Sequence, residues 1–170
     1  REGLGIGSPF NITTATLRFP DFTMAEVEAL LSQHTQATGQ VFPAAVRQEI
    51  YRLTQGQPWL VNALANQIVA EILHHDFSLP ITSAHVALAK KELVQRRAPH
   101  DLASLIDKLQ EPQVKLIVGA ILNGEVPGFN QEVREALSYT RDLGLVTSKP
   151  PVQFANLIYQ DLVIHVLSLN

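Results

Sequence analysis

The glycine-rich stretch GLGIGS, residues 3–8, is the first segment whose residue types could bind phosphate. A dinucleotide-binding loop needs a strand before it, a helix directly after it and a different glycine spacing, which this stretch does not offer. No Gly in the sequence is followed by Lys, so a Walker A loop is absent, and no apolar strand ends in paired acids that would hold magnesium. The chain therefore lacks the residues for a phosphoryl-transfer centre of its own.

Histidines are the second group that could do chemistry, as metal ligands or general bases. His74 and His75 precede Asp76, but adjacent helical residues point about 100° apart and no second histidine stands four residues away. A polar helix end explains these residues better than a metal site does. The other histidines stand in separate segments without the local pattern of a catalytic triad: His34, His85, His100 and His165.

The turn of Gly56, Gln57, Pro58 and Trp59 is the third candidate. Gly56 can adopt the left-handed conformation that ends one helix, and Pro58 fits the first position of the next, where a missing N–H loses no hydrogen bond. The new helix start is electropositive and can face a phosphate or a polar sugar, while Pro58 and Trp59 offer apolar surface to a base. From the residues alone, a sharp corner is favoured over a nucleotide contact.

Composition limits the elements that can position these residues. The 170 residues are 46% hydrophobic, which suits one compact domain or two small ones. A net charge of -3 gives no general attraction to nucleic acid or to an anionic membrane. The absence of Cys excludes disulfides and thiolate metal sites and favours a cytoplasmic location, and no apolar run approaches the roughly 20 residues of a membrane helix.

Capping and proline signals predict a four-helix bundle over residues 23–99. Each helix start is marked by a capping residue or by a proline: Thr23, Pro43, Pro58 and Thr82. Glu26 completes a capping box with Thr23, and Pro99 ends the fourth helix. The third helix carries apolar residues over a wide arc as far as Ile72, so we expect it at the centre of the bundle.

From Asp101 the pattern changes to short helices followed by a hairpin. Two short β-rich runs, Leu145 to Thr147 and Val152 to Phe154, surround a Ser-Lys-Pro-Pro turn, and Asn156 caps a last helix. Three helices, a two-stranded wing and a closing helix are typical of a winged-helix domain, a relative of helix-turn-helix folds.

A winged helix can lay its recognition helix in the DNA major groove, but charge argues against DNA here. Residues 101–170 carry five Lys or Arg against eight Asp or Glu, a net of -3. The expected recognition helix carries Glu132, Glu135 and Asp142 beside Arg134 and Arg141, and repulsion between these acidic residues and phosphate would weaken docking. Two basic pairs earlier in the chain are interpreted as solvated helix surface: Lys90 with Lys91, and Arg96 with Arg97.

Nearly the whole chain resembles the C-terminal part of bacterial P-loop ATPases of the AAA-like/STAND group. The matching stretches are GSPFNI, FTMAEVEALLSQHTQATGQVF, TQGQPWLVNALANQIV, PITSAHV, DLGLVTS and FANLIYQDLV. In such ATPases the Gly-x-Pro turn, matched by Gly56-Gln57-Pro58, begins a helix of a lid bundle that faces the nucleotide bound by the preceding P-loop domain. A winged-helix domain follows and reports or restrains the nucleotide state.

Two positions depart from the family pattern. No Arg stands between Pro58 and Asp76, so the arginine that many AAA-type lids aim at the γ-phosphate has no counterpart there. Leu157 stands where the family often has Pro in the last motif.

The resemblance implies a mainly α fold in three parts. A loop and short β remnant of the ATPase core would occupy residues 1–22, a helical lid bundle residues 23–99, and a winged-helix domain with a small two-stranded wing residues 100–170. The nucleotide-facing residues would be Gly56, Gln57, Pro58 and Trp59. The implied chain has no catalytic or metal-binding residues of its own.

In functional terms, the resemblance implies a non-catalytic regulatory portion of an ATPase. ATP and magnesium would be bound by the parent chain, whose upstream core is the expected partner of these domains. Because the sequence starts at Arg1, we expect a fragment that can self-associate through apolar surface the core would cover. The alternative is an autonomous winged-helix module that binds DNA or a protein partner.

The missing Walker segments lead to a first prediction. The purified 170-residue chain should release no phosphate from ATP above the buffer background, because it has neither a phosphate-cradling loop nor magnesium carboxylates. A phosphate-release assay checks this. Steady release that disappears on mutating a residue of this chain would contradict the prediction.

Overall fold

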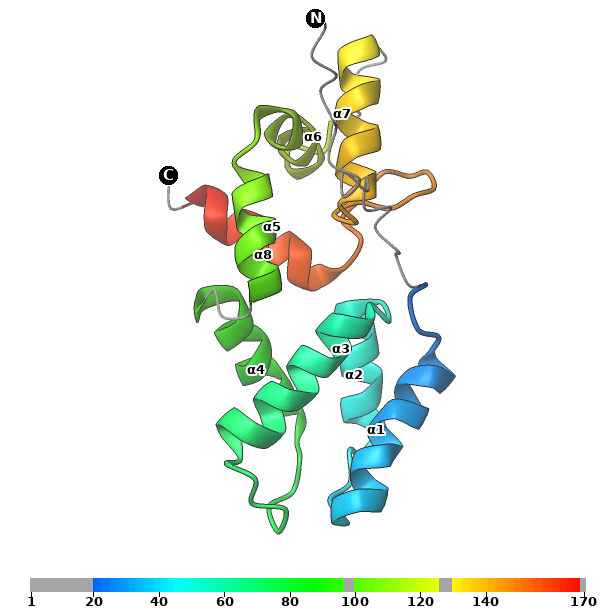
Figure 1. Ribbon diagram of the computed structural model, residues 1–170, viewed down its shortest axis with the longest axis vertical. Coiled ribbons are helices and arrows are strands. Elements are labelled where there is room, and N and C mark those ends of the chain that lie inside the picture. The colour runs from blue at the N-terminus through cyan, green and yellow to red at the C-terminus, as the bar shows by residue number, and fades with distance from the viewer. Residues whose placement is uncertain (1–19, 97–99, 126–129, 169–170) are drawn as a thin grey trace, which may run out of the picture.

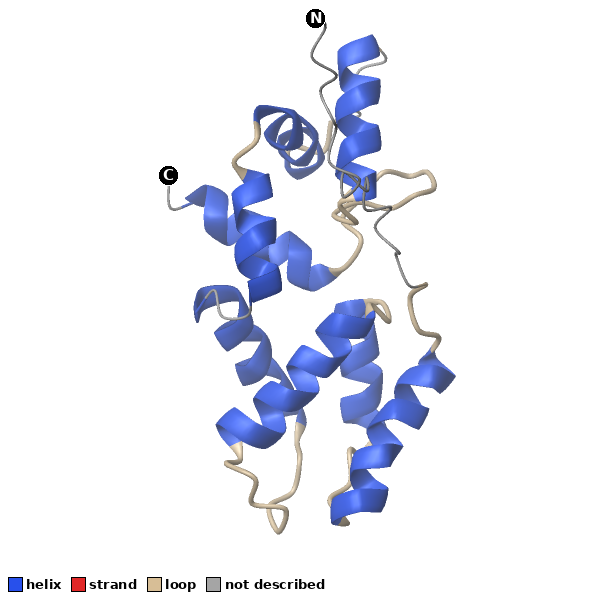
Figure 2. Ribbon diagram, viewed as in Figure 1, coloured by secondary structure: helices blue, strands red, loops and turns tan. Residues whose placement is uncertain are grey.

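The computed structural model describes residues 20–96, 100–125 and 130–168, and this part of the chain is mainly helical, as predicted (Figures 1 and 2). The predicted remnant at residues 1–22 and the predicted helix end at Pro99 lie largely outside the described residues. None of the described helices combines the length and the apolar run that crossing a membrane requires. In chain order the elements are α1 (Met24–Thr38), α2 (Ala44–Thr54), α3 (Pro58–Asn66), the π-helical η1 (Gln67–Ile72), α4 (Ser83–Arg96), α5 (His100–Leu109), α6 (Pro112–Leu122), α7 (Gln131–Asp142) and α8 (Leu157–Ser168).

Local capping explains where several helices begin. Thr23 and Glu26 form the predicted capping box, in which Thr23 Oγ1 accepts from the Glu26 N–H and Glu26 Oε2 accepts from the Thr23 N–H at 2.7 Å. Asn130 Oδ1 accepts from the Val133 N–H at 2.8 Å and so caps α7. These starts were predicted from sequence because a cap involves only residues three apart.

The third predicted helix occupies the centre of the lower bundle of Figure 1, formed by α1 to α4. It continues from α3 into η1, and its inward side chains are fully buried: Leu60, Val61, Leu64 and Ile68. It ends at Ile72, the last residue of the predicted apolar arc. His74 and His75 already have left-handed backbone, with φ of 49° and 58°.

The predicted two-stranded wing is not found among the described residues. Its place is taken by an isolated antiparallel bridge between Val146 and Phe154, flanked by hydrogen bonds from Thr147 N–H to Gln153 O and from Ala155 N–H to Leu145 O, both 2.9 Å. On the turn side the Gln153 N–H donates to the Thr147 hydroxyl oxygen at 3.2 Å, so the return backbone hydrogen bond that would continue the ladder is replaced by a side-chain contact.

The last helix lies between the two parts of the molecule. α8 packs against α2 and α4 of the lower bundle and against α5 of the upper part (Figure 1). Its side chains Ile158, Leu162 and Val163 are fully buried and belong to the same hydrophobic cluster as the lower helices. The predicted winged-helix segment therefore shares its core with the bundle.

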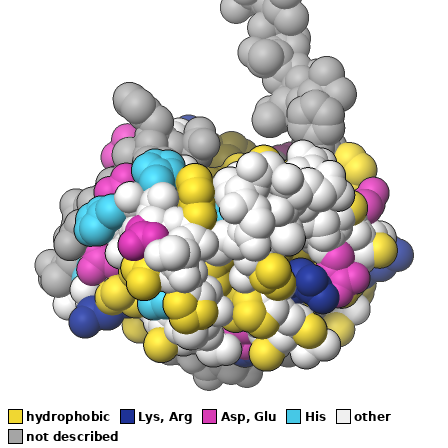
Figure 3. Space-filling model, turned by 90° about the horizontal axis from the view of Figure 1, so that it is seen from below, with side chains coloured by type: hydrophobic (Ala, Val, Ile, Leu, Met, Phe, Trp, Pro, Cys, Tyr) yellow, Lys and Arg dark blue, Asp and Glu magenta, His cyan; other side chains and the backbone are white. Residues whose placement is uncertain are grey.

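A buried glutamine joins the two loops at the lower end of the bundle. Gln40 Nε2 donates to the carbonyl oxygens of Asp76 and Leu79, and its side-chain oxygen lies 2.9 Å from His34 Nε2. These loops expose large apolar side chains, among them Phe77 and Leu79. The molecule seen from below shows hydrophobic side chains interspersed with polar and charged ones (Figure 3). Gln40 thus ties the loop that carries Phe77 and Leu79 to the C-terminal end of α1 through satisfied hydrogen bonds.

The chain enters α1 by crossing the turn between α2 and α3. The Phe22 N–H donates to the Gly56 carbonyl at 2.7 Å, and a Cβ built on Gly56 would lie 1.9 Å from the Phe22 carbonyl oxygen. Gly56 also has φ of 77°, which L side chains rarely adopt. Both the backbone conformation and the close approach therefore require glycine at this position.

The second prediction compares two left-handed glycines. Gly39→Ala should lower the free energy of unfolding by about 1–2 kcal/mol, because the φ of Gly39 is 80°. No further loss is expected there, since an added Cβ would meet nothing within 4 Å. Gly56→Ala should cost roughly 1–2 kcal/mol more, because Phe22 must move and its hydrogen bond weakens. Urea denaturation followed by circular dichroism measures both losses. Equal losses would show that the Phe22 contact is dispensable.

Candidate functional site

The predicted nucleotide-facing residues lie together in the corner between α2 and α3. Gly56 is buried, whereas Gln57, Pro58 and Trp59 are half-buried and remain accessible from one side. Gln55 precedes them with φ of 50°, so two consecutive left-handed residues reverse the chain within one turn.

Gln57 caps α3, a role that the sequence analysis did not predict. Its side-chain Oε1 accepts from the Leu60 N–H at 3.0 Å, and its carbonyl oxygen accepts from the Val61 N–H at 3.0 Å. Gln is not among the preferred capping residues, so sequence gave little signal for it. Since Pro58 has no N–H, a phosphate at this helix start would meet the Trp59 N–H and would have to displace Gln57 to reach Leu60. The geometry suits contact with a sugar or a base better than a phosphate cradle.

Trp59 connects the corner to the last helix. Its Nε1–H donates to the Tyr159 hydroxyl at 3.1 Å, and the two ring centroids lie 6.4 Å apart. Tyr159 is buried in α8. The polar edge of the indole is therefore engaged within the chain, and only part of the ring is left for the apolar contact predicted from sequence. Tyr159 stands 100 residues away from Trp59, and no local pattern indicates the pairing.

An ion pair adds a second link between α8 and the bundle. Lys90 Nζ of α4 lies 2.5 Å from Asp161 Oδ2 of α8, with both side chains partly exposed. The sequence analysis interpreted Lys90 as helix surface, and its side chain is partly exposed, but it also pairs with a helix that only the fold brings near. Exposed pairs of this kind contribute at most about 1 kcal/mol, so its main effect is to orient α8.

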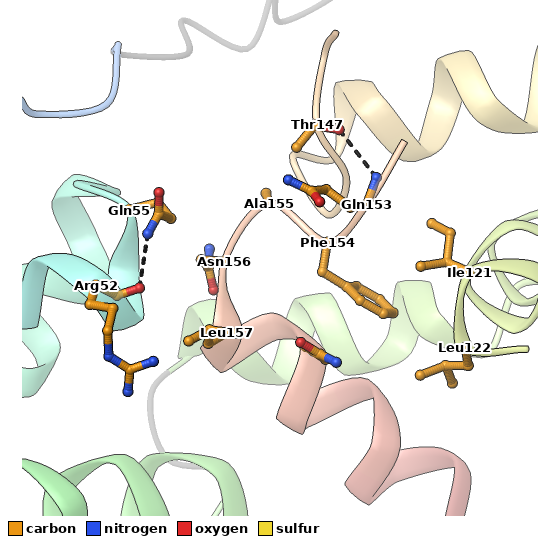
Figure 4. Close-up of a pocket in the computed structure, with 11 residues that line it drawn as sticks. Arg52, Gln55, Ile121, Leu122, Thr147, Gln153, Phe154, Ala155, Asn156 and Leu157 are labelled. Carbon is orange, nitrogen blue, oxygen red and sulfur yellow. Dashed lines mark hydrogen bonds between the residues drawn. The ribbon is translucent and has the colours of Figure 1, made fainter. Parts of the chain in front are cut away.

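A cleft of about 540 Å³ opens beside the corner, between the lower bundle and the bridge segment (Figure 4). Gln55 and Arg52 line it from α2, and Phe154 and Asn156 from the opposite side. Arg52 is the one charged residue of its described lining, and its guanidinium makes two 2.7 Å hydrogen bonds to Glu49. The volume lies within the range of small-molecule sites, and the lining is rich in side-chain amides that suit a neutral polar group.

Two of the other sequence candidates, His34 and His75, lie in one aromatic cluster. His34 and His75 both pack edge-on against Phe77, with centroid distances of 5.7 and 6.1 Å. Within the described ranges, no three His, Asp or Glu side chains come together in a way that could hold a metal ion. The GLGIGS stretch lies outside the described residues.

Comparison of the chain with protein-family models, with curated proteins and with solved structures finds no match.

The third prediction tests the contact between Trp59 and Tyr159. Trp59→Phe and Tyr159→Phe should each lower the free energy of unfolding, because each breaks the hydrogen bond between α3 and α8. The double variant should lose about 1 kcal/mol less than the sum, since the bond is lost only once. Urea denaturation followed by circular dichroism gives the three values.

Tyr139→Phe on α7 provides the control pair. Combined with Trp59→Phe, it should be additive within roughly 0.5 kcal/mol, because the Tyr139 ring lies instead beside Lys108 Nζ, 6.0 Å from its centroid. Strict additivity for the Trp59 and Tyr159 pair as well would mean that the hydrogen bond does not couple the two helices.

Proposed function

We propose that this chain is the lid and winged-helix portion of a bacterial AAA-like or STAND-type P-loop ATPase. In this proposal it is not catalytic. It closes over a nucleotide held by a P-loop core elsewhere in the parent chain and passes the nucleotide state on as a movement of its domains.

One observation supports this proposal most directly: the α2–α3 corner joins three distant segments. Phe22, which leads into α1, hydrogen-bonds to Gly56, and Trp59 hydrogen-bonds to Tyr159 of α8. Only Gln57 and Pro58 separate Gly56 from Trp59, so a displacement of the corner reaches both the entry of the chain and its last helix. A relay between a nucleotide and a C-terminal domain needs such a short path of packed, hydrogen-bonded groups.

The residues at the corner fit one side of a nucleotide. The phosphates and the magnesium ion require donors that this chain lacks, and the proposal assigns them to the core. The corner would contribute the Pro58 ring, the exposed part of Trp59 and the Trp59 N–H, which can contact a base and a sugar hydroxyl. A Gly-Lys-Ser or Gly-Lys-Thr loop encoded upstream of Arg1 is a requirement of the proposal.

The exposed apolar loops are consistent with a core as partner. Phe77 and Leu79 are 40% and 43% exposed in a loop that Gln40 binds through the carbonyls of Asp76 and Leu79, so a domain that packs there would bury both side chains. The proposal assigns the covering role to the ATPase core.

The fourth prediction separates a nucleotide contact from a simple corner. In the parent ATPase, Pro58→Ala should weaken ADP or ATP binding several-fold, on the order of 1 kcal/mol, because an apolar contact is lost and the helix start is less well aimed. Calorimetric titration with nucleotide measures the affinity, and thermal melting measures the stability.

Pro112→Ala is a matched control, since Pro112 occupies the same first position in α6. It should leave nucleotide affinity unchanged, while both variants lose at most about 1 kcal/mol of stability. Unchanged affinity in Pro58→Ala would leave the Gly-Gln-Pro turn with a purely structural role.

A further inference from the structure

A second surface lies on the upper part of the molecule, away from the corner. A groove of about 590 Å³ runs between the N-terminal ends of α6 and α7. Its described lining contains three carboxylates and no Lys or Arg: Glu111, Pro112, Gln113, Leu116, Glu132, Glu135 and Ala136.

Leu116 gives this groove an apolar floor. Its side chain is 44% exposed, whereas Val114, Ile117 and Val118 on the same helix are fully buried in the core. The face of α6 that carries Val114, Ile117 and Val118 packs in the core, whereas Leu116 lies on the exposed face and does not contribute to that core. A large apolar side chain at the base of a groove is the kind of anchor around which protein interfaces form.

The charge of the groove comes mainly from α7. Glu111 is neutralised by Lys108, whose Nζ lies 2.8 Å from Glu111 Oε1. Glu132 and Glu135 are exposed on the first turns of α7, and Glu135 accepts a hydrogen bond from Gln131. Acidic residues near a helix start stabilise the helix by themselves, but that effect does not account for the exposed leucine beside them.

We propose that the groove between α6 and α7 binds a basic amphipathic segment of a partner protein. An apolar side chain of the partner covers Leu116, and its Lys or Arg residues face Glu132 and Glu135. The same two carboxylates would repel a phosphate backbone, so this surface selects protein over nucleic acid. The proposal does not depend on the ATPase assignment.

The test uses the intact chain and two synthetic helical peptides. One peptide carries Leu at helical spacing with Lys on the flanking positions, and the other carries Glu in place of every Lys. Fluorescence anisotropy of the labelled peptides gives the dissociation constants. The chain should bind the Lys peptide at least about tenfold more tightly than the Glu peptide, because the charges match only in the first case.

Two double variants locate the binding surface. The double variant Glu132→Gln and Glu135→Gln removes two negative charges at the groove. The control variant Glu125→Gln and Asp142→Asn also removes two negative charges, from exposed residues at the C-terminal ends of α6 and α7. The first pair should weaken Lys-peptide binding about tenfold, and the second less than about twofold. Equal weakening would show a general charge effect and would overturn the proposal.

Leu116→Gln tests the apolar anchor, since Gln has a similar length and favours helix. It should weaken Lys-peptide binding roughly fivefold with an unchanged melting curve. Peptide binding that is insensitive to this change would overturn the proposal. So would salt-dependent binding of duplex DNA to the unaltered chain, because it would assign the surface to nucleic acid.

Discussion

The main chain of Phe22 lies so close to Gly56 that no side chain fits between them, and much of the arrangement follows from this approach. The hydrogen bond from the Phe22 N–H to the Gly56 carbonyl fixes where the chain enters α1. The left-handed backbone of Gly56 then turns the chain, so that Gln57 caps α3 and Pro58 starts it. The direction of the central helix, and with it the position of Trp59, is set at this one point.

The last helix, α8, connects the two parts of the molecule. α8 lies in the segment that was predicted to form a winged helix, yet it packs on α2 and α4, and its residues Tyr159 and Asp161 bond to the lower bundle. Neither bond is strong alone, since a typical hydrogen bond contributes about 1 kcal/mol and an exposed ion pair less. The buried apolar side chains of α8 supply most of the stabilisation, and the polar contacts determine its orientation.

Short-range sequence signals predicted the helices, but they could not predict contacts between side chains that lie far apart in the chain. The caps at Thr23 and Asn130 involve residues within one helical turn, so the local sequence is sufficient to predict where α1 and α7 begin. The wing prediction failed because Val152 to Phe154 look like a strand, while the Gln153 N–H bonds to the Thr147 side chain and only one backbone bridge forms. The Trp59–Tyr159 and Lys90–Asp161 contacts depend on the fold of α8 as a whole. At the candidate site, sequence located the corner but missed the cap that Gln57 provides.

Trp59 is the single tryptophan of the chain, and its indole nitrogen is bonded across the α3–α8 contact. Indole emission depends on the polarity around the ring and on the hydrogen bond of its N–H. Its intrinsic fluorescence therefore originates at the place where the two halves meet. A separation of α8 from α3 would break this hydrogen bond, expose more of the half-buried ring and shift the emission to longer wavelength, so the protein carries an optical reporter of the α3–α8 contact without any attached label.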